Sequence, residues 1–176
     1  AVTLKGGFDN DRLSGSAKAD TLRGGFGNDR LFGLGGADRL YGDYGNDRLF
    51  GGAGRDALSG GDGVDLLDGG PGVDVILGGG GNDRVLGRGG DDRIDAGDGN
   101  DRVEPGPGRD RVQAGDGNDS VLVRDGAVDT VSCGEGRDTV VADPDDQVAA
   151  DCEVVSPPTA KPVGSSREKP YPLGTP

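Results

Sequence analysis

The sequence predicts an all-β fold, a right-handed parallel β-roll of about seven coils with 18 residues per coil. The chain of 176 residues repeats itself every nine residues between residues 6 and 141, and glycine fills 38 of its positions. Each of the fifteen repeat units carries aspartate at its sixth position and Leu, Ile or Val at its eighth. Hydrophobic residues make up only 31% of the chain and the formal charge is −13. Because apolar burial alone cannot order such a chain, we expect a second source of stability.

The repeats divide the chain into four segments. Residues 1–5 lead into the roll, and residues 6–141 form it. Residues 142–155 (ADPDDQVAADCEVV) depart from the repeat and are expected to cap the last coil, whereas residues 156–176 form a Pro-rich tail or docking arm. No apolar run approaches the roughly 18 residues that a membrane span requires. The sequence starts at Ala1 without a signal-peptide pattern, so we expect a processed, mature protein.

Residue type follows position within each unit. Glycines at positions one, two and four permit the positive φ of a tight turn and the close approach of neighbouring backbones. Aspartate at position six is short and anionic and presents oxygen to a hard cation. The next residues, as in Arg30-Leu31-Phe32, alternate faces as in a strand, so that Leu31 points inward. Two units therefore make one coil of two turns and two short strands, and successive coils pair in parallel.

This pattern resembles the RTX, or hemolysin-type, calcium-binding repeat, GGxGxDxUx, in which U is a large aliphatic residue. The resemblance covers residues 6–141. It implies that Ca²⁺ lies between the turns of adjacent coils, held by backbone carbonyls and by the position-six aspartates of both turns. It also implies export, because these repeats accompany secreted toxins, proteases, lipases and adhesins.

The resemblance places the metal ligands in two rows, one along each edge of the roll. Eight turns on one edge leave seven gaps and seven turns on the other leave six, so about thirteen Ca²⁺ ions are the ceiling. The first row is Asp11, Asp29, Asp47, Asp65, Asp83, Asp101, Asp119 and Asp138. The second row is Asp20, Asp38, Asp56, Asp74, Asp92, Asp110 and Asp129.

Several units depart from the motif, with smaller departures at Asp9, Pro105 and Ala114, and we expect weaker sites in the two units that depart most. Lys18 replaces the fourth-position glycine and brings a like charge to the cation. The unit at 123–132 (VRDGAVDTVS) lacks its first two glycines and has one inserted residue. The sites near Asp119 and Asp129 are therefore doubtful.

A comparison of apolar burial with the entropy cost of ordering the backbone makes calcium the expected second source of stability. Burial of one Leu or Val stabilises by about 1.5–3 kcal/mol, whereas ordering each residue of backbone costs roughly 1–2 kcal/mol. One inward aliphatic side chain in nine residues does not offset that cost. We therefore expect metal binding and folding to be one event, with a disordered chain in the absence of Ca²⁺.

The two cysteines, Cys133 and Cys152, lie near the end of the repeats. An even count in a chain with so small a core suits a disulfide and an oxidising, extracellular setting. Two free thiols in a cytosolic protein are the alternative.

Arginines and aromatic residues each have two interpretations. Position seven carries arginine in eight units, which suits either polyanion binding or solvated strand faces paired with carboxylates such as Asp68, Asp95 and Glu104. We favour the second and expect no nucleic-acid partner. Most aromatic rings are expected to be exposed, either as an assembly surface or stacked on one another without a partner. The residues of this assembly surface are Phe8, Phe26, Phe32, Tyr41, Tyr44, Phe50 and Tyr171.

Two functions fit these features. The first is an extracellular calcium-binding structural protein that self-associates head to tail into fibres or a surface matrix, because a roll has strand edges at both ends. The alternative is a calcium-dependent folding, secretion or adhesin module of a larger exoprotein. We expect neither an enzyme nor a small-molecule substrate, because the chain has no His and its aspartates are assigned to metal.

Overall fold

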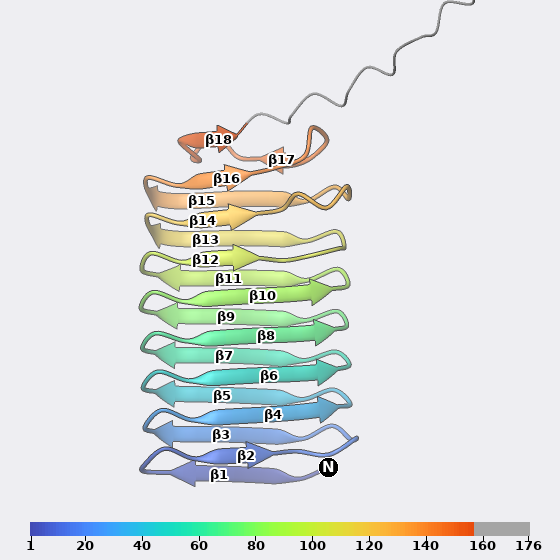
Figure 1. Cartoon of the computed structure of the whole chain (residues 1–176), viewed down its shortest axis with the longest axis vertical. Coiled ribbons are helices and arrows are strands. Elements are labelled where there is room, and N and C mark those ends of the chain that lie inside the picture. Colours follow the sequence, from blue (N-terminus) through green and yellow to red (C-terminus); the bar gives the residue numbers. More distant parts are fainter. Residues whose placement is uncertain (157–176) are drawn as a thin grey trace, which may run out of the picture.

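The structure is a computed structural model that describes residues 1–156. Its regular elements are eighteen strands, which form two parallel nine-stranded sheets (Figure 1). Odd-numbered strands form one sheet and even-numbered strands the other, so the chain crosses between the sheets after every strand. Successive strands of a sheet pair with an offset of 18 residues, as Leu4 pairs with Leu22. The predicted parallel β-roll with about 18 residues per turn is confirmed.

The strands are short because each is interrupted by a turn of the nonapeptide. The first sheet consists of β1 (Thr3–Gly7), β3 (Thr21–Phe26), β5 (Arg39–Tyr44), β7 (Ala57–Asp62), β9 (Val75–Gly80), β11 (Arg93–Asp98), β13 (Arg111–Gly117), β15 (Thr130–Gly136) and β17 (Gln147–Val148). The second consists of β2 (Arg12–Ser14), β4 (Arg30–Gly35), β6 (Arg48–Ala53), β8 (Leu66–Pro71), β10 (Arg84–Gly89), β12 (Arg102–Glu104), β14 (Ser120–Leu122), β16 (Thr139–Val141) and β18 (Val154–Ser156).

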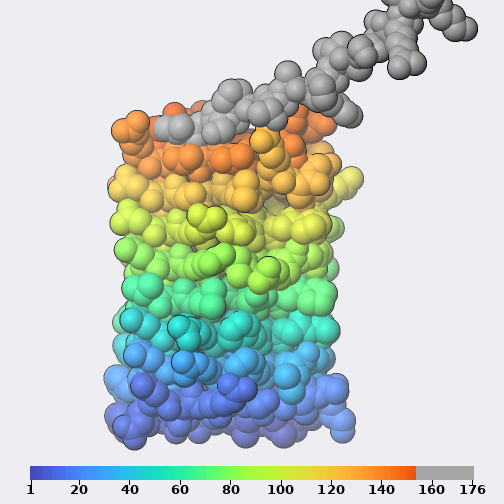
Figure 2. All heavy atoms as spheres, viewed as in Figure 1, coloured from blue at the N-terminus to red at the C-terminus, as the bar shows by residue number. Residues whose placement is uncertain are grey.

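The core is a column of aliphatic side chains between the two sheets. Leu22, Leu31 and Leu40 are fully buried, and the eighth position of later units continues the column as Ile or Val. In Figure 2 the sequence colours form successive bands along the roll, as expected for a solenoid in which each coil packs on its neighbours. Residues 1–156 contain no helix with the length and apolar character needed to cross a membrane.

The first position of each unit also points into the core, which the sequence did not reveal. Among the later units this position holds Ala96, Ala114, Val123 and Cys133, all of them buried. In the earlier units it holds glycine, and these glycines do not adopt the positive φ that the sequence predicted for them. That part of the prediction was wrong. The first position therefore needs no special φ, and glycine, alanine, valine or cysteine can occupy it.

Positions two and four adopt positive φ in most units, as predicted. Gly25 and Gly45, for example, have φ of 115° and 121°. Leu34 and Arg88, at position two, are held at φ of 82° and 84°, a conformation that L-residues rarely adopt. The regular turn therefore persists at Leu34 and Arg88 without glycine, but not in the unit at 15–23, where Ser16 and Lys18 do not adopt positive φ.

The two ends of the roll extend beyond the repeats. Strand β1 begins at Thr3, and the segment after the last repeat supplies β17 and β18, one to each sheet. Each sheet consequently has nine strands, more than the seven coils expected from the repeats alone.

The predicted Cys133–Cys152 disulfide is present, with a Cα–Cα distance of 5.1 Å. Closing this loop contributes roughly 3 kcal/mol in the chain-entropy model. The predicted docking arm, with Tyr171, falls at residues 157–176, outside the described residues.

Candidate metal centre

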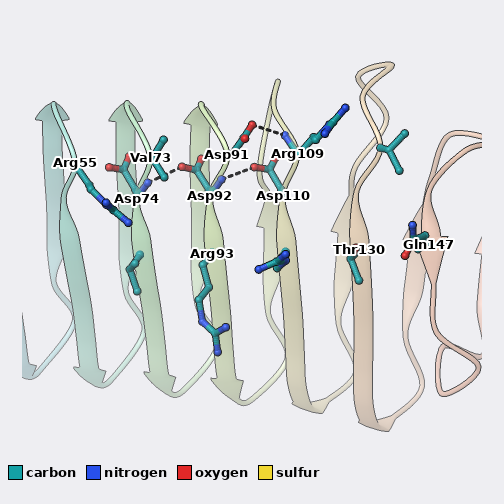
Figure 3. A pocket seen from close by; sticks show the side chains of 13 residues that line it. Arg55, Val73, Asp74, Asp91, Asp92, Arg93, Arg109, Asp110, Thr130 and Gln147 are labelled. Atoms are coloured by element: carbon teal, nitrogen blue, oxygen red, sulfur yellow. Dashed lines mark hydrogen bonds between the residues drawn. The ribbon is translucent and has the colours of Figure 1, made fainter.

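The position-six aspartates form the two predicted rows, one along each edge of the roll. Within a row, each backbone N–H donates to the carboxylate Oδ1 of the aspartate one coil further on. The distances are 2.7 Å from Asp47 N to Asp65 Oδ1 and 2.9 Å from Asp65 N to Asp83 Oδ1. Figure 3 shows the second row, in which Asp92 N donates to Asp110 Oδ1 at 2.7 Å. Each aspartate therefore ties its own turn to the turn before it.

The other carboxylate oxygen of these aspartates has no partner. Fourteen Oδ2 atoms are buried and accept no hydrogen bond. A buried carboxylate oxygen without a donor or a cation is strongly unfavourable. The aspartates concerned are Asp11, Asp29, Asp38, Asp47, Asp56, Asp65, Asp74, Asp83, Asp92, Asp101, Asp110, Asp119, Asp129 and Asp138.

In the units that begin with glycine, a backbone carbonyl of the next coil approaches the position-six carboxylate. Beside Gly24, the Oδ2 of Asp29 and the carbonyl oxygen of Gly42 border a space so small that a single Cβ on Gly24 would collide with both. The same arrangement recurs at Gly42. Carboxylate and carbonyl oxygens together are the ligands that Ca²⁺ prefers, so the residues present fit this ion.

Burial raises the pKa of the inner aspartates above the ordinary value of 3.8. The pKa is raised to about 7 for Asp65, Asp74 and Asp101, because burial disfavours the charged form and neighbouring aspartates add repulsion. The folded metal-free roll therefore holds more protons than the unfolded chain. The stability that protonation supplies is fully present below about pH 4 and is lost as the pH rises through 7. At neutral pH a cation must replace those protons.

Asp20 is the exception in both rows. Its Oδ2 accepts hydrogen bonds from the backbone N–H and the hydroxyl of Ser16, at 2.6 and 2.8 Å. Burial alone would raise its pKa, but the hydrogen bonds from Ser16 and Val2 outweigh burial, so the pKa is lowered. Asp20 belongs to the unit with Lys18, which was expected to bind Ca²⁺ weakly. Its carboxylate is already satisfied by the protein, in agreement with that expectation.

Two acidic residues of the cap continue the rows, and the sequence analysis missed them. Asp146 Oδ1 accepts from the N–H of Asp129 at 2.9 Å, and Glu153 Oε2 accepts from the N–H of Asp138 at 3.0 Å. Both stand where the next position-six aspartate would be. The signal was present in the sequence, because Asp146 and Glu153 each precede a valine by two residues, as position six precedes position eight.

Comparison with known proteins agrees with this geometry. The family model of the RTX calcium-binding nonapeptide repeat matches the chain at residues 5–40, 32–67, 41–76, 68–103 and 104–140. The chain belongs to this RTX family. It is therefore a calcium-binding β-roll. No curated protein matches the RTX chain.

The aromatic residues of the RTX roll are both stacked and exposed. The rings of Phe8, Phe26 and Tyr44 stack along one edge, with centroids 5.2 and 4.8 Å apart. Phe8 is 76% exposed. Phe32 and Phe50 stack on the second sheet at 5.1 Å and are only half-buried. The two interpretations of these rings are thus compatible, since stacking leaves one face of the row open to solvent.

Two of the position-seven arginines, and one arginine at position two, pair with acidic residues on the sheet faces. Arg84 and Arg102 share Glu104, at 3.5 and 2.9 Å. Arg88 pairs with Asp68 at 2.7 Å. These pairs favour the interpretation of the arginines as solvated strand faces, and the absence of a nucleic-acid partner stays a prediction.

Proposed function

We propose that the two aspartate rows bind Ca²⁺ between consecutive turns, up to about thirteen ions, and that this binding folds the roll. The observation that carries the proposal is the row of buried Oδ2 atoms without partners. In the units that begin with glycine, this oxygen lies next to the carbonyl oxygen of a neighbouring coil, which supplies a further ligand for a hard cation. The ion would offset repulsion along the row as well as the cost of burying each charge.

Replacement of one mid-row aspartate should remove calcium sites. Asp65 borders two gaps, toward Asp47 and toward Asp83, so Asp65→Asn should lower the ion count by one or two in native mass spectrometry. When the free Ca²⁺ concentration is about a hundred times the dissociation constant of a site, the loss of that site should lower the free energy of unfolding by about 2.7 kcal/mol. Asp62→Asn is the matched control, because Asp62 is exposed in the same coil. Equal ion counts in the two variants would refute the assignment.

We further propose that the protein is extracellular and structural, and that its rolls associate end to end. The disulfide favours an oxidising compartment. Strands β1 and β2 end their sheets with one edge unpaired within the described residues, and such edges recruit other strands. The stacked aromatics begin at this end with Phe8. The chain has no His, and the aspartates of its repeats are assigned to metal. Both features favour a role without catalysis.

A specific observation also favours the alternative, a module that docks on a neighbouring domain of a larger exoprotein. Strand β17 is only two residues long, and the carboxylates of Asp146 and Glu153 close the turns at that end. Within the described residues, the turns at this end are thus closed by acidic side chains, whereas the other end, which we call the open end, begins with the unpaired edges of β1 and β2. A single open end suits one docking contact better than an unlimited fibre.

The state of assembly separates these two functions. If the rolls associate head to tail, electron microscopy of the calcium-loaded protein should show filaments that lengthen with concentration. Phe8→Ser should shorten them, because Phe8 is exposed at the open end, whereas Tyr44→Ser removes a ring further along the same stack and should not. Uniformly monomeric particles at all concentrations would reject self-association and leave the docking module.

A further inference from the structure

The irregular unit at 123–132 builds a turn unlike the others. Its additional residue changes the offset between coils, since Asp110 N donates to Asp129 Oδ1 at 2.8 Å across 19 residues rather than 18. The row itself is not broken by the insertion. The surplus length is taken up in the segment between β14 and β15, where Asp125 lies at the third position of the unit.

Asp125 replaces a backbone carbonyl with a carboxylate. In the regular turns of this edge, the N–H at position four donates to the position-three carbonyl 17 residues later, as from Gly72 to Gly89 at 2.7 Å and from Gly90 to Pro107 at 3.0 Å. In the irregular turn, Gly108 N instead donates to Asp125 Oδ2 at 3.1 Å. The other oxygen, Oδ1, accepts from Ala127 N at 2.7 Å. Two N–H groups thus hold the Asp125 carboxylate in place.

This carboxylate joins the aspartate row. Asp110, Asp125 and Asp129 each offer a carboxylate oxygen, and these oxygens lie within 4.8 Å of one another. Independently of that clustering, the Oδ2 atoms of Asp110 and Asp129 are buried and have no hydrogen-bond partner. Both residues are at least 99% buried. Three carboxylates at this spacing repel one another strongly unless a cation lies between them.

We propose that Asp110, Asp125 and Asp129 form a Ca²⁺ site that binds more tightly than the regular turns of the roll. The inference rests on the proposed function of the aspartate rows and deepens it at one turn. Calcium affinity rises with the number of charged ligands and with the rigidity of the site. Here a third carboxylate, held by two N–H donors, stands where a regular turn offers a neutral carbonyl. This proposal is the opposite of the expectation that the insertion weakens the site near Asp129, and the experiment below decides between the two.

Asp125→Asn tests this site because it removes the charge and keeps an amide oxygen that can accept from Gly108 or Ala127. The matched control is Asp116→Asn. Asp116 is also an exposed aspartate at position three, but its turn is regular and its backbone carbonyl accepts from Gly99 at 2.7 Å. Circular dichroism at saturating Ca²⁺ should show equal β content in both variants and the wild type.

The readout is hydrogen exchange followed by mass spectrometry across a titration of free Ca²⁺. In the wild type, peptides spanning residues 106–129 should gain protection at lower free Ca²⁺ than peptides spanning residues 60–75. Asp125→Asn should raise the midpoint at residues 106–129 by about tenfold, since one of three charged ligands is lost, and Asp116→Asn should shift it by less than about twofold. Mass spectrometry of the intact protein at the wild-type midpoint should find one ion fewer in Asp125→Asn.

The possible failures are distinguishable. If no peptide of the wild type gains protection with Ca²⁺, the proposed function of the rows is wrong. If the regular turns gain protection but Asp125→Asn and Asp116→Asn behave alike, the rows bind Ca²⁺ and the three-carboxylate site alone is refuted.

Discussion

Removal of Ca²⁺ at pH 7.5 is expected to abolish nearly all of the β-sheet signal of the chain. The physical reason is the two rows of buried carboxylates, whose Oδ2 atoms have no partner in the protein. The chosen pH lies above the raised pKa of about 7 at Asp65 and Asp110, so most of these carboxylates are charged and protonation replaces the metal only in part. Each filled site adds about 2.7 kcal/mol at a hundredfold excess over its dissociation constant. The sum over several sites exceeds the net stability of a typical domain, about 5–15 kcal/mol.

The measurement is far-ultraviolet circular dichroism during titration with a calcium chelator, followed by return of excess Ca²⁺. The signal should reappear on return of Ca²⁺ but not on addition of Mg²⁺, which demands a smaller octahedral site. At pH 4.5 the chelated chain should keep more β-sheet than at pH 7.5, because the raised pKa values favour the folded state when protonated. Full β content after exhaustive chelation at pH 7.5 would contradict a roll held together by metal.

Gly45→Ala is expected to destabilise the calcium-loaded roll by about 3 kcal/mol or more. Gly45 is the fourth residue of a regular turn and has φ of 121°, where a residue with a side chain is strained. A Cβ there would also overlap the carbonyl oxygen of Gly27 in the preceding coil. The coils would have to separate at this point, and the turn ligands with them. Urea unfolding in saturating Ca²⁺ measures the loss.

Gly80→Ala is the matched control. Gly80 is the third residue of its unit, and a Cβ there would come no closer than 3.9 Å to Asp62 Oδ1. Its φ is not positive, so alanine should be neutral or should stabilise by up to about 1 kcal/mol through the unfolded state. A similar loss in both variants would show that the spacing of neighbouring backbones does not limit what position four tolerates.

Much of the roll could be predicted from the sequence because its structure is local and repeated. The nine-residue period placed Leu31 inward and Arg30 outward, and the structure has Leu31 fully buried and Arg30 exposed. The period also placed the aspartates in two rows and aligned them at 18 residues, as the hydrogen bond from Asp47 to Asp65 shows. Parallel pairing of identical units leaves little freedom in the register.

The prediction was less successful wherever the period is broken. The cap was recognised as a departure from the repeat, but not as a segment that continues both rows through Asp146 and Glu153. The insertion was expected to weaken the site near Asp129, which stays a prediction, and the sequence did not indicate that Asp125 would lie beside Asp110 and Asp129. Comparison with a motif shows which residues of the motif are missing. Only the tertiary structure shows that the Asp125 carboxylate takes the place of a position-three carbonyl as the acceptor of an N–H group.

The sequence by itself determined the fold class and the two rows of aspartates, because both follow from a spacing along the chain, and it indicated the partners of the disulfide, because the chain has only two cysteines. Only the tertiary structure decided how each carboxylate is used. It showed that Oδ1 is occupied by the N–H of the preceding coil while Oδ2 is buried and free, and that Ser16 satisfies Asp20 instead. Those differences arise between neighbouring coils, where atoms far apart in sequence come within hydrogen-bonding distance.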